Sequence, residues 1–355
     1  MRKKVFFVLS SLRAGGAERV FWLISQHFNK SDYEVCLVLL NAQNCFFPTE
    51  IEDVRIIDLK TSRAALSFGA LYKIIIRERP YAIFSAGGQV DMVLSILSYF
   101  VTVPFLIARS TNIPGERVKY SNYKSKVFTR LGNFLFLYNR FDKIICQTEE
   151  MRDAWRESPR MDSQKLIVIP NPVINNNNSC KKVQHSDEMK LIIVGSFSKK
   201  KGHIRLLEIV RMLPENYKLT IVGSGGLEDE IQEAIRNFGL ANRVNLVGQI
   251  SNVCELIATH QILVITSYVE GFPNVALEAL SVGVPVVSFK VSGISDLIVD
   301  GFNGYAVKQG DLSAFKDRLI KASVIDWNGQ LIKEDVANRY AIKPIVKMYE
   351  ELIKH

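Results

Sequence analysis

Short apolar runs alternate with amphipathic segments along the first half of the chain. The run Val5–Leu9 ends in a glycine turn, and the stretch Ala17–Phe28 that follows has apolar residues at helical spacing. Strands that are apolar on both faces and separated by helices are typical of a parallel sheet with helices on each side. The same pattern predicts strands at Val35–Leu40, Arg55–Asp58, Ala82–Ser85, Phe105–Ala108 and Lys143–Gln147, and helices at Phe68–Arg79 and Val90–Phe100.

A proline-rich exit ends this first pattern. The segment Ile167–Val173 reads Ile-Val-Ile-Pro-Asn-Pro-Val and predicts a strand that runs into two prolines, which stiffen the chain. Asparagines at 175–178 and a polar run to about Met189 follow, a composition typical of a loop. We therefore place a domain boundary here, with residues 1–172 in the first domain and residues 173–339 in the second.

The alternation of strands and helices restarts after this boundary. A second α/β domain and a cleft between the two domains are therefore expected, and ligands of such sheets bind beyond the carboxyl ends of the strands. The pattern predicts strands at Leu191–Val194, Lys218–Val222, Val244–Leu246, Ile262–Ile265 and Val286–Phe289, and helices at Ile204–Met212, Leu227–Phe238 and Val275–Val282.

Composition narrows the class of protein. Of the 355 residues, 48% are hydrophobic and 23% are charged, which indicates a soluble globular chain and excludes a disordered, collagenous or coiled-coil one. The five cysteines stand singly, so neither a disulfide framework nor a zinc ribbon is expected, and a reducing compartment fits best. The basic start Met1–Ser10 lacks a cleavage pattern and predicts a buried strand rather than a signal peptide.

The positive charge is concentrated in the first half. Residues 1–170 hold 24 Lys and Arg against 16 Asp and Glu, whereas residues 171–355 hold 21 against 20. Between Arg117 and Lys143, seven Lys or Arg and seven Phe or Tyr stand against one acid, Asp142. Interleaved cationic and aromatic residues suit the interface of an anionic bilayer. The alternative is a helix with one face in the core, and nucleic-acid binding is disfavoured because no recognisable module is present.

A pair of glycines follows the first predicted strand and opens a helix. In Gly15-Gly16-Ala17-Glu18, the glycines let backbone N–H groups approach an anion, and the helix N-terminus favours negative charge. The motif is not G-x-G-x-x-G, which argues against a nicotinamide-dependent dehydrogenase. A purely structural βα turn is the alternative interpretation.

The equivalent turn of the second half is basic. Gly195-Ser-Phe-Ser-Lys-Lys-Lys-Gly202 follows a strand and places Lys201 just before the next helix, where an ammonium can hold a diphosphate as a point charge. A solvated basic loop is the alternative, and the sequence is no Walker P-loop. Arg205, one turn beyond Lys201, either adds a second positive group or lies on the helix surface.

The remaining acidic positions do not predict a metal site. Gly223-Ser-Gly-Gly226 closes the second strand of this half, and the acids Glu228–Glu230 that follow suit a first helical turn that complements the helix dipole. No D-x-D sequence occurs in the chain, which makes a nucleotide held through a divalent metal less favoured. We expect neither a metal nor another cofactor.

Two glutamates frame the segment that is richest in chemistry. Glu270 stands on a Gly-Phe-Pro-Asn turn after a buried strand, and Glu278 lies about one turn inside the short apolar helix that starts near Asn274. Two carboxylates and the free N–H groups of a helix N-terminus thus converge where a nucleotide sugar could bind, and a carboxylate in an apolar stretch needs a partner. The structural alternative is that both glutamates form salt bridges within the protein, and an internal ion pair of either one would overturn the assignment.

At these residues the sequence resembles the family-4 retaining glycosyltransferases. The strongest match is E-x7-E from Glu270 to Glu278, together with the downstream Gly283-Val-Pro285. The resemblance implies the GT-B fold, that is, two Rossmann-like parallel-sheet domains facing each other across a cleft, with a C-terminal helix (residues 340–355) that packs back on the first. Further matches are Gly15-Gly-Ala-Glu18, Val168-Ile-Pro-Asn-Pro172, Gly195 with Lys201-Gly202, Val222-Gly-Ser-Gly225 and Val247-Gly248.

The resemblance also implies residue roles. Glu278 would hold the ribose hydroxyls, Glu270 would contact the donor sugar, and Lys201 would stabilise the departing diphosphate, because preorganised cations and N–H dipoles suit the charge that develops there. Retaining members work without a protein nucleophile. The predicted catalytic pair is Glu270 and Lys201, and the predicted donor-binding residues are Gly16, Ser196, Arg205, Gly248, Gly271, Phe272, Pro273, Asn274, Val275 and Glu278.

Two departures and one tentative acceptor side accompany the resemblance. Asp296 stands where glutamate is commoner among relatives, which is a mild change. Many relatives have arginine where this chain has Ser196, so either Arg205 replaces it or phosphate binding is weaker. On the acceptor side we expect Gly15, Arg109 and Asn112, with a surface-paired loop arginine as the alternative for Arg109.

The leading hypothesis is transfer of a hexosyl unit from a nucleotide sugar to a glycan acceptor that is linked to a lipid. The enzyme is then expected to be cytoplasmic and bound peripherally to the inner face of the cell membrane, where this acceptor is presented. The alternatives are a nucleotide-sugar epimerase or hydrolase of the same fold, and a non-catalytic protein that binds a nucleotide sugar. The nucleotide base, the sugar and the linkage remain open, because variable loops determine them.

Overall fold

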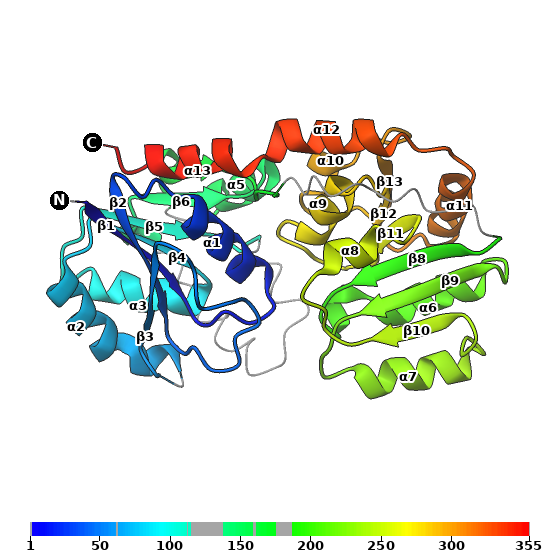
Figure 1. Ribbon diagram of the computed structural model, residues 1–355, viewed down its shortest axis with the longest axis horizontal. Helices are drawn as coiled ribbons and strands as arrows, with labels where there is room; N and C mark the ends of the chain where they lie inside the picture. Colours follow the sequence, from blue (N-terminus) through cyan, green and yellow to red (C-terminus); the bar gives the residue numbers. More distant parts are fainter. Residues whose placement is uncertain are drawn as a thin grey trace. The chain divides into compact units, whose positions relative to one another are not determined.

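Two compact units make up the described part of the chain (Figure 1). The computed structural model describes residues 2–61, 63–111, 113–114, 138–158, 161–174 and 187–354. Unit 1 comprises Met1–Pro172 and Ile342–His355, and unit 2 comprises Val173–Ala341. The chain therefore passes between the units twice, after Pro172 and after Ala341.

Unit 1 is built on a seven-stranded parallel sheet with the order β3-β2-β1-β4-β5-β6-β7. Its strands are β1 (Lys3–Leu9), β2 (Tyr33–Leu39), β3 (Val54–Asp58), β4 (Ala82–Ala86), β5 (Phe105–Arg109), β6 (Lys143–Cys146) and β7 (Leu166–Val168). The predicted strands of this half are present. The last one, predicted to run into two prolines, ends at Val168, because Pro170 and Pro172 lack the N–H that a sheet ladder needs.

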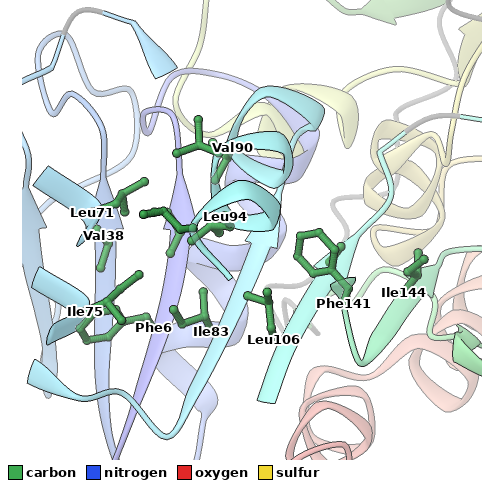
Figure 2. Close-up of a cluster of buried hydrophobic side chains, with 14 of the residues drawn as sticks. Phe6, Val38, Leu71, Ile75, Ile83, Val90, Leu94, Leu106, Phe141 and Ile144 are labelled. Carbon is green, nitrogen blue, oxygen red and sulfur yellow. The ribbon is translucent and has the colours of Figure 1, made fainter. Parts of the chain in front are cut away.

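Alternate side chains of β1 enter different layers of unit 1. Phe6 belongs to a buried cluster with Leu71 of α2 and Leu94 of α3, which Figure 2 shows against the sheet. Phe7, on the opposite face, packs edge-on against Phe21 of α1 at 5.3 Å between ring centres. Each fully buried phenylalanine contributes about 2 kcal/mol of apolar burial.

The helices of unit 1 are α1 (Gly16–His27), α2 (Phe68–Glu78), α3 (Gly88–Leu97), α5 (Glu149–Arg156) and α13 (Ile342–Glu351), with 3-10 turns η1 (Ala64–Ser67) and η4 (Ser163–Lys165).

The C-terminal helix α13 belongs to unit 1. It packs beside α1, as Figure 1 shows, and the Oε1 atom of Glu350 accepts a 2.7 Å hydrogen bond from the backbone N–H of Asn29. The ring of Tyr349 lies 5.6 Å from that of Phe84 on β4. Tyr340 and Ala341, which we had included in this returning segment, lie in unit 2.

Unit 2 is a six-stranded parallel sheet with the order β10-β9-β8-β11-β12-β13. The five predicted strands are present, and β13 (Gly304–Val307), which the pattern did not predict, completes the edge. The other strands are β8 (Met189–Val194), β9 (Tyr217–Val222), β10 (Val244–Val247), β11 (Ile262–Ile265) and β12 (Val286–Phe289). The helices are α6 (His203–Arg211), α7 (Glu228–Asn237), α8 (Val253–Ile257), α9 (Asn274–Ser281), α10 (Ile294–Leu297), α11 (Leu312–Ser323) and α12 (Gly329–Tyr340), with η5 (Lys199–Lys201) before α6.

In both sheets, the first strand of the unit lies at the point where the strand order reverses, with β1 between β2 and β4 and β8 between β9 and β11. The turns after these strands are therefore where ligands of such sheets bind. Within the described residues, no helix has both the length and the apolar character that a membrane span needs.

Candidate functional site

The basic turn after β8 is held against the end of β11 by a glycine. Gly202 has φ 68°, a left-handed conformation that favours glycine, and a Cβ atom there would overlap the carbonyl oxygen of Thr266. The Thr266 hydroxyl in turn donates to the Gly202 carbonyl at 3.0 Å. This close approach places Lys201 beside the loop that follows β11, and α6 begins at His203 without a side-chain cap.

Lys201 and Glu270, predicted as the catalytic pair, are in direct contact. Lys201 Nζ lies 2.5 Å from Glu270 Oε1, and the Ser267 hydroxyl donates to the same oxygen at 2.5 Å. Burial alone would raise the pKa of Glu270, but the Lys201 ammonium, the two hydrogen bonds and the charge of Lys200 hold that pKa below its usual value of 4.5. Glu270 is therefore ionised at neutral pH.

This contact is an internal ion pair, the arrangement that we had counted against the site. The identity of the partner decides how this ion pair is interpreted, because Glu270 pairs with Lys201, the same ammonium that is predicted to hold a diphosphate. The Lys201 side chain is 20% exposed, so an incoming anion can reach it and compete with Glu270. The pair therefore brings both predicted groups to one point and leaves the cation partly accessible.

The turn that carries Glu270 leads into α9, where Glu278 lies. Gly271, Phe272 and Pro273 are buried, and Asn274 and Val275 at the start of α9 are half-buried. No side chain caps the N-terminus of α9, and a helix N-terminus carries a positive partial charge that favours an anion. Glu278 is buried on the same helix, with 6% of its surface exposed.

Arg205 is committed to contacts inside unit 2. Its Nε donates to the Thr266 carbonyl at 2.6 Å, and its Nη1 donates to Gln309 at 3.0 Å. The guanidinium also lies 3.7 Å from the ring centre of Tyr268 and 4.3 Å from that of Phe289. These contacts suit a residue that positions the end of β11. The surface alternative is wrong, because Arg205 is buried.

The other glycine turns of unit 2 differ in how closely they pack against neighbouring segments. Gly223, after β9, has φ 146°, and a Cβ atom there would overlap the carbonyl oxygen of Gly195. The two turns therefore lie in contact. Gly248, after β10, is exposed and meets nothing within 4 Å of an added Cβ atom, and Ser196 is exposed beside Ser198.

The glycine turn of unit 1 is occupied by a carboxylate. The side chain of Glu18 folds back over Gly15, so that an added Cβ atom would overlap it. Burial raises the pKa of Glu18, while a hydrogen bond to its own backbone N–H and the charge of Arg109 oppose this rise. Gly16, the first residue of α1, is exposed.

Arg109, predicted on the acceptor side, is buried at the carboxyl end of β5, with 3% of its surface exposed. Its Nη2 donates to Oδ1 of Asn171, and Tyr349 and Glu18 interact with the same guanidinium. The alternative of a surface-paired loop arginine is therefore wrong. Asn112 and the segment 115–137, which contains most of the predicted membrane-binding stretch, lie outside the described residues.

Pattern analysis missed several residues of this region. The hydroxyl of Ser267 donates a hydrogen bond to Glu270, and that of Thr266 donates one to the Gly202 carbonyl. The side chain of Gln309 accepts a hydrogen bond from Arg205. The position of Ser267 at the end of a buried strand was a usable signal, whereas Gln309 comes from a loop beyond β13 that carries no motif. No cluster of three or more His, Cys, Asp or Glu side chains able to hold a metal occurs in the described part of the chain.

Comparison with known proteins places this chain in a family. The family described as Glycosyltransferase Family 4 matches residues 14–175, and that described as Glycosyl transferases group 1 matches residues 175–326. An uncharacterized glycosyltransferase of Haemophilus influenzae is 24% identical, over 88% of this chain and 88% of its own length.

A Campylobacter jejuni relative, also 24% identical over 89% of this chain and 88% of its own, is named as a GalNAc-α-(1→4)-GalNAc-α-(1→3)-diNAcBac-PP-undecaprenol α-1,4-N-acetyl-D-galactosaminyltransferase. The crystal structure of Anabaena HepE in complex with UDP and glucose superposes with a TM-score of 0.81 at 19% identity, over 99% of both chains. The two parallel-sheet units are those of the GT-B fold. With both halves of the chain matched, and the E-x7-E glutamates at the end of β11 and in α9, the chain belongs to the group 1, family 4 glycosyltransferases.

Proposed function

We propose that this glycosyltransferase moves a hexosyl unit from a nucleotide-diphosphate sugar to a glycan acceptor with retention of anomeric configuration and without a metal ion. The observation that carries the proposal is the Lys201–Glu270 contact beside the uncapped starts of α6 and α9. An accessible ammonium beside two helix N-termini, which carry positive partial charge, favours an anion at the carboxyl end of the sheet.

The donor is recognised by unit 2 in this proposal. The donor diphosphate replaces Glu270 as the partner of Lys201 and accepts hydrogen bonds from the backbone N–H groups of Asn274 and Val275. The released Glu270 then contacts the sugar, and Glu278, on the helix that the same turn leads into, binds ribose hydroxyls.

The chemistry follows from charge development. As the bond between the sugar anomeric carbon and the diphosphate oxygen breaks, negative charge grows on the leaving group, and fixed dipoles with a nearby cation stabilise it most in the transition state. The acceptor hydroxyl attacks from the face that the nucleotide leaves, which retains configuration without a protein nucleophile. Because Lys201 supplies the positive charge, a chelator such as EDTA is expected to leave turnover unchanged.

The decisive experiment replaces Glu270. Glu270→Ala is expected to abolish turnover while substantial nucleotide binding remains, because the diphosphate ligand Lys201 is retained. Thermal shifts with UDP-, GDP- and ADP-sugars identify the donor base and report binding independently of turnover. Unchanged turnover in Glu270→Ala would remove Glu270 from the mechanism.

The same assay separates the two alternatives. An epimerase or hydrolase converts the nucleotide sugar with no acceptor present, and a non-catalytic binding protein shows a thermal shift without any turnover. The Campylobacter relative, named for an undecaprenol-linked substrate, supports a lipid-linked acceptor and thus a transferase.

We further propose that unit 1 docks on the anionic inner face of the cell membrane, where such an acceptor is held. Six exposed apolar side chains gather on η1, α2 and the end of α3, and the rings of Phe68 and Phe100 join the two helices at 5.9 Å. Figure 1 shows α2 and α3 side by side. This α2–α3 surface consists of Leu66, Tyr72, Ile76, Ile96, Tyr99 and Phe100, with Arg63, Lys73, Arg77, Arg79 and Arg140 around it.

Its charges support an anionic surface as the partner. Arg140 stacks on Tyr99 at 4.4 Å, and the acid on α2, Glu78, is already engaged by Lys4, Arg55 and Arg77. Aromatic residues beside cations suit the boundary between headgroups and acyl chains.

Flotation with vesicles containing phosphatidylglycerol at low salt tests this docking. The protein is expected to float with anionic vesicles but not with phosphatidylcholine alone, and a Tyr99→Ser, Phe100→Ser variant is expected to lose most of the binding. Val324→Ser, at an 80% exposed position of unit 2, is the matched control. Absence of flotation for the unaltered protein would overturn the docking without affecting the transfer reaction.

A further inference from the structure

Helix α12 has one buried face along its whole length. Ile332, Val336 and Tyr340 follow one another at intervals of four residues, and all three are buried. Residues at this spacing lie above one another on a helix, so they form a single apolar stripe. Tyr340 ends the stripe as the last residue of α12, with 5% of its surface exposed. Its large ring is therefore packed against other segments of unit 2.

Helix α12 packs against α9, the helix that carries Glu278. The end of α9 meets the start of α12, because a Cβ atom on Gly283 would overlap the carbonyl oxygen of Gly329. Gly283 has φ 80°, a conformation that also favours glycine. The end of α12 meets the opposite end of α9, where Tyr340 contacts Phe272. The two helices therefore run in opposite directions, and α12 supports α9 at both ends.

Phe272 belongs to the turn between β11 and α9, and we call residues 270–274 the Glu270 turn. The ring centres of Phe272 and Tyr340 lie 6.2 Å apart with 62° between their planes, an edge-on arrangement that aromatic pairs favour. On another side, a Cβ atom added to Gly293 at the start of α10 would lie 3.0 Å from the Phe272 ring. The ring is thus held between α12 and α10, and Phe272 is 9% exposed.

The polar atoms of Tyr340 fix its ring in place. The hydroxyl donates to the carbonyl oxygen of Asp296 in α10 at 3.1 Å and accepts a hydrogen bond from Nη2 of Arg339 at 2.8 Å. The backbone carbonyl of Tyr340 accepts the N–H of Val173, the first residue of unit 2, at 2.8 Å. One residue therefore contacts the Glu270 turn, α10 and the segment with which the chain enters unit 2.

We infer that Tyr340 is a positioning residue for the donor site, which holds the Glu270 turn through the ring of Phe272. Glu270 lies two residues before Phe272, so a shift of this ring displaces its carboxylate. Lys201 lies on a different segment, whose position the contact between Gly202 and Thr266 sets. The distance between Glu270 and Lys201 therefore depends on Tyr340, although Tyr340 stands 70 residues beyond the turn in the sequence.

Hydrogen–deuterium exchange of the full chain tests this positioning without any substrate. Tyr340→Leu keeps an apolar side chain in the buried position but removes the ring and the hydroxyl. We expect the amides of residues 271–278, in the Glu270 turn and the start of α9, to exchange roughly five-fold faster, whereas those of β8 and β9 keep their protection. Tyr340→Phe, which keeps the ring that packs on Phe272, is expected to restore most of the protection.

The matched control is Tyr305→Leu. Tyr305 on β13 is 3% exposed, and its ring packs edge-on against Trp327 at 6.0 Å, so its burial and packing resemble those of Tyr340. This variant is expected to leave the exchange of residues 271–278 unchanged. Faster exchange of these amides in both leucine variants, or in neither, would overturn the inference.

A second variant removes the same contact from the other side, in case Tyr340→Leu fails to fold. In Phe272→Leu, the amides of residues 276–278, which lie inside α9 and away from the substituted side chain, are then expected to exchange faster. Unchanged protection of these amides would contradict the positioning role.

Steady-state kinetics separates positioning from structural support, and this arm rests on the proposed function. Well below its unfolding temperature, Tyr340→Leu is expected to lower kcat about ten-fold, because a small displacement of a group that contacts the reacting sugar is costly. The donor KM should change little, since Lys201 remains in place, and Tyr340→Phe should recover most of the lost kcat. Tyr305→Leu should leave kcat nearly unchanged.

The outcomes distinguish this inference from the proposed function. A raised donor KM at constant kcat in Tyr340→Leu would assign the ring to donor binding and overturn the positioning role, as would unchanged kinetics. If the unaltered chain transfers no sugar to any acceptor, the proposed function fails, and the exchange comparison of Tyr340→Leu with Tyr305→Leu alone decides the positioning.

Discussion

The first βα turns of the two units carry opposite charges over equivalent glycines. In unit 1 the Glu18 carboxylate covers Gly15, and the buried Arg109 faces it, whereas in unit 2 the Lys201 side chain packs against Gly195 and Glu270 faces it. The cations differ in exposure, because Arg109 is 3% exposed as a residue and the Lys201 side chain 20% exposed. An accessible cation can exchange its carboxylate for a ligand anion, whereas a buried one remains a structural partner. Equivalent turns thus place a partly accessible cation in one unit and a buried one in the other.

Removing the accessible cation is expected to have the largest effect. Lys201→Met should lower kcat/KM by about a hundred-fold or more, since preorganised charges at the leaving group supply that much stabilisation. Steady-state kinetics and nucleotide thermal shifts measure the loss. Lys200→Met removes an exposed neighbouring charge and should change kcat/KM less than about three-fold. Equal losses in the two variants would show that general positive charge, rather than the position of Lys201, matters.

A substitution at Gly202 tests the geometry of the unit 2 turn, and we expect it to have the next largest effect. Gly202→Ala forces a left-handed conformation on a residue with a Cβ atom that overlaps the Thr266 carbonyl, so the free energy of unfolding should fall by about 2 kcal/mol or more. Gly226→Ala, where an added Cβ atom meets nothing within 4 Å, is the matched control and should leave stability nearly unchanged. Urea unfolding measures both, and similar midpoints for the two variants would contradict the tight packing inferred here.

The smallest effects concern pH, and they should have opposite signs in the two turns. The lowered pKa of Glu270 means that its ionised form stabilises the fold above pH 4.5, a contribution lost as the pH falls through its folded value. The raised pKa of Glu18 means that its ionisation destabilises the fold at neutral pH, a cost that disappears as the pH falls.

Matched amide variants measure this difference. At pH 7, Glu270→Gln should lower and Glu18→Gln should slightly raise the free energy of unfolding, each by about 1 kcal/mol or less, and both differences should shrink toward pH 3. Changes of the same sign at pH 7 would show that the two carboxylates lie in equivalent environments.

Local pattern predicted a large part of this arrangement. Apolar runs such as Val5–Leu9 and Ile262–Ile265 could be recognised as buried strands, because parallel strands covered on both faces are apolar throughout. The glycine turn before α6 and the spacing of Glu270 and Glu278 could be read in the same way, since each is a short-range feature. β13 escaped detection because Gly304–Val307 is short and starts with a glycine.

Contacts between distant segments could not be read from any such pattern. Nothing near Arg109 in the sequence indicates that Asn171 and Tyr349 surround it, and Arg205 could as easily have been on the surface of α6 as stacked on Tyr268 and Phe289. The sequence likewise did not show which residue pairs with Glu270, although Lys201 and Glu270 had both been predicted as site residues.

The order of residues alone was enough to establish two parallel-sheet units, the turns at their ligand-binding edges and the family of the chain, because hydrophobic period, glycine turns and motif spacing act over a few residues. Which charge is buried, which is accessible and which carboxylate faces which cation were settled only by folding. Those properties depend on burial and on charges brought together from remote parts of the chain, and both come into being when the sheets and helices pack.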